Sequence, residues 1–154
     1  MWRMNPRLLF SLALTIATQQ PQTPPPPMQT QLPAAAPMQS QVIDWTSLVP
    51  KPTRNGQRRD VFDAPTGTLD RFHGHITTLN PGENTGPLHR HPQEELIVIK
   101  EGTLEINIDG RKQTAGPGSM VFFGVNENEN MTNIGETPAT YLVLQWFTPR
   151  TPKN

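Results

Sequence analysis

Beyond residue 60 the sequence consists of short strand-like runs separated by turn residues, and no stretch has the period of an amphipathic helix. Residues 104–109 alternate apolar and polar side chains, as a strand does when one face is buried and the other meets water. The pair Asp109-Gly110 suits a two-residue hairpin turn, whose central residues both need a positive φ. Similar runs occupy residues 68–79, 95–100, 120–123 and 140–147. We therefore expect an all-β domain, a sandwich or a barrel, with a loop at the Asn- and Glu-rich residues 126–133.

Composition restricts the kinds of partner and site. The 154 residues are enough for one domain. Thirteen basic residues balance thirteen acidic ones, so the charge predicts no binding to nucleic acid. Arg54, Arg58 and Arg59 stand beside Asp60, and we expect them to lie in a solvated loop. The sequence has no cysteine, which excludes disulfides, iron–sulfur clusters and thiolate zinc sites.

The N-terminus has the features of a secretory signal. Residues 1–7 carry two arginines, residues 8–17 are mostly apolar, and Thr15-Ile16-Ala17 offers a cleavage site. Ten apolar residues are too few to cross a bilayer, so we expect no stable membrane anchor. The pattern therefore predicts a signal peptide at residues 1–17 and an exported protein, periplasmic or extracellular.

A change of composition marks where the folded domain begins. Residues 18–41 are almost entirely Gln, Pro, Thr, Ala and Met, which predicts an extended, disordered linker. We expect a β-barrel domain at 42–150 and a short tail at 151–154. The segment 42–48, with Trp45, is expected to pack outside the barrel or across a partner subunit.

A metal-binding pattern precedes the second strand-like run. His89 and His91 lie two residues apart, so in an extended segment their side chains point the same way. Glu95 shares their parity if the bend at Pro92 adds no shift, whereas Glu94 faces the other side. Two imidazoles and a carboxylate can bind a divalent transition metal and leave coordination positions open.

This stretch, from Gly82 to Gly102, resembles the first motif of the cupin family, G(X)5HXH(X)3-4E(X)6G. His89, His91, Glu95 and Gly102 fit the motif. Gly82 stands seven residues before His89 instead of six, a difference that a turn can absorb.

The second cupin motif, G(X)5PXG(X)2H(X)3N, aligns with residues 118–133. Its first glycine and last asparagine are kept, but its proline reads Gly124, its second glycine Asn126 and its histidine Glu129. The resemblance covers roughly residues 60–147. It implies a double-stranded β-helix, that is, a jelly-roll barrel of the small single-domain bacterial type (a monocupin) with its site inside. Because cupins often pair through edge strands, it also implies a homodimer.

Glu129 has two interpretations. In one, its carboxylate replaces the family's third histidine and completes a metal site with His89, His91 and Glu95. In the other it lies in a solvated loop, and three ligands form the facial arrangement of non-haem iron enzymes. Two carboxylates would cancel the charge of a divalent ion, which favours Mn or Fe over Zn, Ni or Cu. Such a neutral site would be a weaker Lewis acid and would attract anions less.

Other side chains are candidates for the surroundings of the site. His75, on the strand before the motif, could orient Glu95 or a ligand histidine, or could be an ordinary core or surface histidine together with His73. Tyr141 and Gln145 share one face of the last strand-like run, and Gln145 could hydrogen-bond a pocket ligand or could equally be a polar residue at the edge of the sheet. The aromatic residues Phe122, Phe123 and Trp146 are expected in the barrel core.

Two functions from different classes follow. The resemblance implies a secreted metal-binding cupin, for example an Fe- or Mn-dependent oxygenase, oxidase or isomerase acting on a small organic molecule. The alternative is a non-catalytic barrel that binds or senses a small molecule and has a degraded metal site. The first motif, which is intact from His89 to Gly102, favours catalysis, and the altered second motif favours binding; the fold alone decides neither.

Overall fold

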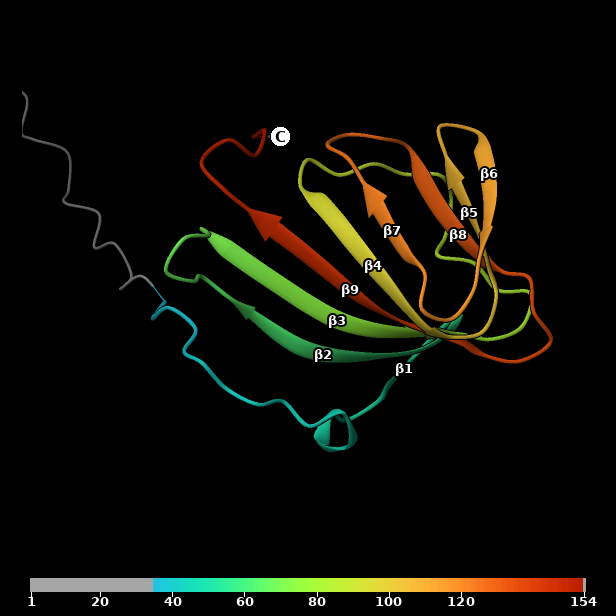
Figure 1. Cartoon of the computed structure of the whole chain (residues 1–154), viewed down its shortest axis with the longest axis horizontal. Coiled ribbons are helices and arrows are strands. Elements are labelled where there is room, and N and C mark those ends of the chain that lie inside the picture. Colours follow the sequence, from blue (N-terminus) through green and yellow to red (C-terminus); the bar gives the residue numbers. More distant parts are fainter. Residues whose placement is uncertain (1–34, 154) are drawn as a thin grey trace, which may run out of the picture. The chain divides into compact units, whose positions relative to one another are not determined.

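The structure is a computed structural model that describes residues 35–153 (Figure 1). The predicted signal peptide and residues 18–34 of the predicted linker lie outside the described residues, so both stay predictions. Residues 35–44 form no helix or strand, and the Met38 amide donates a hydrogen bond to Pro65 O at 2.8 Å. Between residues 35 and 153, no helix has the length and hydrophobicity needed to cross a membrane.

Strands make up nearly all the regular structure of the described residues, in which the one helical element is the 3₁₀ turn η1 (Trp45–Ser47). The strands are β1 (Lys51–Thr53), β2 (Gly56–Ala64), β3 (Arg71–Leu79), β4 (Glu94–Glu101), β5 (Leu104–Ile108), β6 (Arg111–Ala115), β7 (Met120–Phe123), β8 (Glu129–Asn133) and β9 (Ala139–Phe147).

The strands form two antiparallel sheets. One has six strands in the order β1-β2-β3-β9-β4-β7, and the other has three in the order β6-β5-β8. In Figure 1 the three-stranded sheet lies at one end of the six-stranded sheet, across from β4 and β9. The domain is all-β and has the double-stranded β-helix fold that the sequence predicted.

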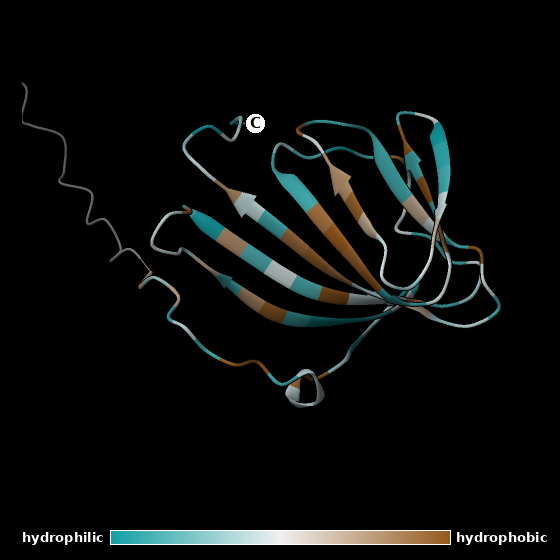
Figure 2. Ribbon diagram, viewed as in Figure 1, coloured by the Kyte–Doolittle hydropathy of each residue, from teal (hydrophilic) through white to brown (hydrophobic). Residues whose placement is uncertain are grey.

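The hydrophobic core lies between the two sheets. Leu104 and Ile106 of β5 and Met131 of β8 pack in one cluster with buried residues of β4 and β9. Figure 2 shows hydrophobic and hydrophilic residues alternating along the strands of the six-stranded sheet. Tyr141, from β9, is among the largest fully buried side chains. Burying apolar area of this kind stabilises the fold by about 25 cal/mol per Å². This packing holds β4, β8 and β9 together, and these three strands carry the site described below.

The five predicted strand-like runs correspond to β3, β4, β5, β7 and β9. Asp109 and Gly110 both have positive φ, as the predicted hairpin turn requires. The prediction of a loop at residues 126–133 was wrong for the second half of this segment, which forms β8. Its residues alternate between buried and half-buried, and the buried polar ones are held by hydrogen bonds, as when Asn133 Nδ2 donates to Leu79 O.

The prediction that Arg58 and Arg59 lie in a solvated loop was also wrong, because both residues lie in β2. Asn55-Gly56, a dipeptide typical of turns, marks the β1–β2 hairpin and is a signal that could have located it. The hairpin pairs Thr53 with Gly56 and joins the six-stranded sheet through β3.

The prediction that Phe122, Phe123 and Trp146 lie in the core is correct only for Phe123. Phe123 is 1% exposed, whereas Phe122 is 52% exposed. Adjacent strand residues point to opposite faces, so only one phenylalanine can enter the core. Phe122 stacks on Trp146 with ring centroids 6.3 Å apart on the outer face of the sheet.

Trp45 packs outside the barrel, the first of the two expected placements. The Lys100 ammonium lies 4.5 Å from the centroid of its ring. Such a cation–π contact contributes roughly 0.5–1 kcal/mol at an exposed site.

Gly102, which closes the first motif, is needed for the fold. Its φ is +87°, and a Cβ there would overlap Ala139 of β9. Replacement of Gly102 by Ala is expected to lower the free energy of unfolding by about 3 kcal/mol, from overpacking and a left-handed backbone together. Gly110 has a similar φ of +83° but open space around it. The matched Gly110→Ala variant should therefore lose only about 1 kcal/mol in urea unfolding; equal losses would show that crowding at Ala139 is unimportant.

Candidate metal centre

The loop between β3 and β4 brings the two motif histidines to the start of β8. The His89 amide donates to Glu129 O at 3.1 Å, and the Glu129 amide donates to His89 O at 2.7 Å. This isolated antiparallel bridge joins the loop to the three-stranded sheet. Glu95 comes from the six-stranded sheet, as the second residue of β4. The site therefore forms where the two sheets meet.

Three potential ligands converge there. One ligand atom from each of His91, Glu95 and Glu129 lies within 4.8 Å of the other two. His91 Nε2 is 2.8 Å from Glu129 Oε1 and 3.5 Å from Glu95 Oε2. Both glutamates are buried, with exposures of 6% and 4%. The interpretation of Glu129 as a solvated loop residue was therefore wrong, since its carboxylate is buried and contacts His91.

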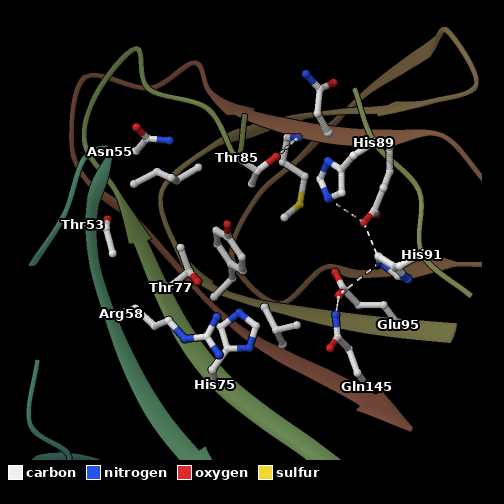
Figure 3. Close-up of a pocket in the computed structure, with 16 residues that line it drawn as sticks. Thr53, Asn55, Arg58, His75, Thr77, Thr85, His89, His91, Glu95 and Gln145 are labelled. Carbon is white, nitrogen blue, oxygen red and sulfur yellow. Dashed lines mark hydrogen bonds and ion pairs between the residues drawn. The ribbon is translucent and has the colours of Figure 1, made fainter. Parts of the chain in front are cut away.

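His89 lies at the rim of this cluster. Its Nε2 is 3.6 Å from Glu129 Oε1, and about half of its side chain is exposed. It is not part of the compact three-residue group, but its ring points to the same glutamate oxygen (Figure 3).

Backbone carbonyls fix the protonation pattern of both histidines. His89 Nδ1 lies 3.0 Å from Pro87 O, and His91 Nδ1 lies 2.8 Å from Gln93 O. A carbonyl oxygen only accepts, so each Nδ1 carries the hydrogen and donates it. Each Nε2 faces Glu129, and that of His91 donates a hydrogen bond to Glu129 Oε1 at 2.8 Å. Loss of the proton from Nε2 would leave a lone pair that can bind a metal ion. Such carbonyl partners commonly orient the histidine ligands of metal sites.

Gln145 holds the carboxylate of Glu95. The two residues are paired in the β4–β9 register, and Gln145 Nε2 donates to Glu95 Oε2. The neighbouring Glu94 faces the other side, where its Oε2 accepts from Trp146 Nε1 at 2.7 Å. The role of orienting Glu95, which the sequence offered to His75, therefore belongs to Gln145.

The two buried carboxylates raise the proton affinity of the site. Burial, and then the charge of Glu129, raise the pKa of Glu95 to about 7. The hydrogen bond to Glu129 raises the pKa of His91 against the effect of its own burial. Without a cation, Glu95 and His91 hold their protons more tightly than usual, so metal binding is expected to release protons.

The raised pKa of Glu95 predicts how the metal-free protein responds to pH. Between its ordinary pKa of 4.5 and about 7, the unfolded chain releases this proton before the folded chain does. The free energy of unfolding therefore falls as pH rises through this window, by about 3 kcal/mol for a shift of this size. Glu95→Gln should remove that loss, so the stability of the variant relative to the parent should grow between pH 4.5 and 8 in urea unfolding with chelator. Glu94→Gln is the matched control, and an equal pH trend in both variants would contradict the assignment.

These residues fit a divalent metal ion. Glu129 Oε2 is buried and has no hydrogen-bond partner among the described residues, which is costly for a carboxylate oxygen. Two carboxylates and two correctly oriented Nε2 atoms are hard-to-borderline donors, suited to Mn, Fe or Zn. An ion among them would satisfy the free oxygen and cancel the repulsion between the two glutamates.

A cavity of about 330 Å³ extends from this cluster into the barrel (Figure 3). Its polar side includes Arg58, His75 and Thr77, and its apolar side includes Met131 and Val143. Tyr141 and Gln145, which share a face of β9, also line the cavity.

The sequence and fold comparisons agree with this architecture. Residues 75–145 match the family model described as a cupin domain. The chain belongs to the cupin superfamily. The curated polyketide synthase CurC of Streptomyces cyaneus is 26% identical to this cupin over 118 residues, which cover 75% of this chain and 74% of that protein.

Solved structures share the fold of this cupin at low sequence identity. The polyketide cyclase RemF from Streptomyces resistomycificus superposes with a TM-score of 0.59 at 23% identity, covering 70% of this chain and 80% of that one. KdgF from Halomonas sp. superposes with a TM-score of 0.60 at 12% identity, covering 75% and 97%.

The cavity of this cupin includes residues that the sequence did not indicate as site residues. Arg58 reaches it from β2, and Thr53 and Asn55 come from the β1–β2 hairpin. The position of these residues at the cavity depends on two strand pairings, that of β2 with β3 and that of β3 with β9. The turn signal at Asn55-Gly56 could have located the hairpin, but no sequence pattern shows which of its side chains face the cavity.

Proposed function

We propose that this cupin is a metal-dependent enzyme that converts a small organic molecule, as an oxygenase, an oxidase or an isomerase. The observation that carries the proposal is the convergence of His91, Glu95 and Glu129 at a cavity of about 330 Å³. An enclosed pocket with a few convergent polar groups is the usual form of a small-molecule site. His89, on the rim, is proposed as the fourth ligand.

The chain's own residues position the ligands and shape the cavity. A bound ion would supply Lewis-acid or redox chemistry at its open coordination positions. Gln145 holds Glu95 in place, and the Pro87 and Gln93 carbonyls hold the two imidazoles. Burial raises the pKa of Tyr141, so its phenol stays neutral and can donate a hydrogen bond.

The relatives support a small-molecule substrate. The similarity to a polyketide synthase, together with a fold shared with a polyketide cyclase, agrees with an organic substrate of modest size. The N-terminal pattern supports export, and we propose a periplasmic or extracellular location. The homodimer also remains a proposal, drawn from the family resemblance.

We propose Mn or Fe as the metal, because two carboxylates cancel the charge of a divalent ion and provide hard oxygen donors. Glu129→His would restore the family's three-histidine set. It is expected to move the metal preference at least about tenfold toward Cu or Ni, which prefer nitrogen donors. Competition binding with Mn and Ni measures this. Identical metal preferences in parent and variant would contradict the charge argument.

The reaction class can be tested before the substrate is known. The full chain is loaded with Mn or Fe and incubated with mixtures of small organic acids, enols and sugars, in air and without oxygen. Mass spectrometry then separates the classes, because an oxygenase adds oxygen mass, an oxidase removes two hydrogens and an isomerase leaves the mass unchanged. Conversion by the loaded protein, and none by the chelated protein, would support the proposal.

The non-catalytic alternative is favoured by the loss of the family histidine at Glu129. It predicts that a compound from the mixture binds without any conversion, with or without metal. That result would replace the enzyme proposal by a binding or sensing role.

A further inference from the structure

The cavity wall opposite the metal cluster contains an anchored arginine. Arg58 Nε donates to Asp60 Oδ1 at 2.9 Å, and Arg58 Nη2 contacts His73 Nε2 at 3.0 Å. No side chain among residues 35–153 accepts a hydrogen bond from its other terminal nitrogen, Nη1. Arg58 lines the cavity in Figure 3. A guanidinium already held on two nitrogens loses little freedom when a ligand binds the remaining one.

The hydrogen bonds of Arg58 determine the state of the neighbouring histidines. Arginine only donates, so His73 Nε2 must accept and carries no hydrogen. His75 Nδ1 lies 3.1 Å from the same atom and must therefore donate. This leaves His75 Nε2 as a bare acceptor, because the one side-chain hydrogen bond of this ring among the described residues uses Nδ1. His75 lines the cavity beside Arg58 (Figure 3).

The charges around this wall leave one positive charge in excess. Asp60 is shared between Arg58 and Lys51, whose Nζ is 2.6 Å from Asp60 Oδ2. Asp63 and Arg71, farther along β2 and β3, neutralise each other. Burial, then the charge of Arg58, lower the pKa of His75 to about 3, so this ring is neutral. At the other end of the cavity, the two glutamates would cancel the charge of a divalent ion.

We propose that the substrate is a small 2-hydroxy acid or a close relative. Its carboxylate binds Arg58, and its neighbouring hydroxyl donates a hydrogen bond to His75 Nε2. The adjacent donor and acceptor on the wall match these two groups, and the excess positive charge selects an anion. The inference rests on the proposed function, because it takes the cavity beside the metal cluster as the substrate site.

The test compares three probes of similar size on the full chain loaded with Mn. The probes are 2-hydroxyglutarate, glutarate and the neutral glutaramide, each titrated by calorimetry. The parent is expected to bind the hydroxy acid best and the amide least. Arg58→Gln should weaken binding of both acids by roughly tenfold or more, the value of one charged hydrogen bond. Arg59→Gln is the matched control, because Arg59 lies on the same strand and lines a different pocket, and it should change affinity less than about twofold.

His75→Leu tests the second contact. It should leave glutarate binding within about twofold of the parent but remove most of the preference for 2-hydroxyglutarate, since one neutral hydrogen bond is lost. Circular dichroism and metal content of each variant confirm that it is folded and loaded. Arg58→Lys serves if Arg58→Gln does not fold, and it should retain part of the affinity because it keeps the charge without the planar fork.

Failure of the inference differs from failure of the proposed function. Equal binding of acids and amide by the parent, or equal effects of the Arg58 and Arg59 variants, would overturn the inference even in a fully loaded protein. A parent that takes up no metal would contradict the proposed function. In that case the same titrations on the metal-free protein still decide whether Arg58 selects an anion.

Discussion

His91→Ala is expected to lose nearly all bound metal while the barrel stays folded. His91 Nε2 lies close to both glutamates, at 2.8 Å from Glu129 Oε1 and 3.5 Å from Glu95 Oε2. Loss of an outer partner of a metal ligand already weakens binding by roughly 10–100-fold, so loss of the ligand itself should exceed about 100-fold. The side chain is not part of the hydrophobic core, so truncation should leave circular dichroism unchanged.

The control for this variant is His73→Ala. His73 is also a partly buried histidine near a carboxylate, but it lies on β3 and away from the cluster. Its loss should leave metal affinity within about threefold of the parent, as expected for a site without shared partners. Normal metal stoichiometry in His91→Ala, measured by mass spectrometry after dialysis, would remove His91 from the ligand set.

Glu129→Gln is expected to have opposite effects on metal binding and on metal-free stability. The amide keeps the shape of the side chain and can still accept a hydrogen bond from His91. It removes a buried charge whose Oε2 has no partner among the described residues and which repels Glu95. Metal affinity should fall by at least about 100-fold, because a charged ligand is lost. At pH 8 in chelator, where Glu95 is mostly ionised, the free energy of unfolding should rise by about 1 kcal/mol. The repulsion of Glu95 and the unpartnered oxygen should then cost more than the loss of the ion pair with His91, whose hydrogen bond the amide keeps.

Glu105→Gln is the control for the change of charge. Glu105 lies on β5, next to β8, and its Oε1 pairs with Lys112 Nζ at 2.8 Å near the surface. An exposed pair of this kind contributes about 0–1 kcal/mol, and its loss should not affect the metal. A Glu129→Gln variant that binds metal as tightly as the parent would leave a site of two histidines and one carboxylate.

A measured trade-off of this kind between metal binding and stability would support a functional origin for the pair of glutamates. Residues selected only for stability would not place two carboxylates in the protein interior within reach of one histidine. Proteins commonly tolerate such local cost at sites of binding or catalysis.

Much of the fold was predictable because its strands follow simple rules. The alternation in residues 104–109 and the Asp109-Gly110 turn both appear in the structure. Strand β8 was not predicted from the sequence, because its inward residues Glu129 and Asn133 are polar. The alternation of apolar and polar residues that normally indicates a buried strand face was therefore weak. Their burial depends on partners from distant strands and on the loop before β4, which no local pattern shows.

The candidate site was predictable only where a motif covers it. His91 and Glu95 stand at positions of the first motif, so the family resemblance by itself predicts that they share a site. Glu129 stands where the second motif has a histidine, and the sequence left its role open between a ligand and a loop residue. Gln145 acquires its role from the β4–β9 register, and Arg58 from the pairing of β2 with β3. Both roles depend on tertiary structure, because they follow from the pairing of strands that lie far apart in the sequence. The exposure of Phe122 has a simpler origin, since neighbouring strand residues cannot both enter one core.

The most direct test of the account is the metal content of the purified protein. The full chain is prepared without a metal-affinity tag, and its bound metals are measured by mass spectrometry, as isolated and after reconstitution with Mn or Fe. The account predicts close to one equivalent of Mn or Fe per chain, retained on dialysis and lost in Glu129→Gln. A protein that holds no metal even after reconstitution would contradict the metal centre, and the barrel would then be a binding module in which Glu129 marks a lost site.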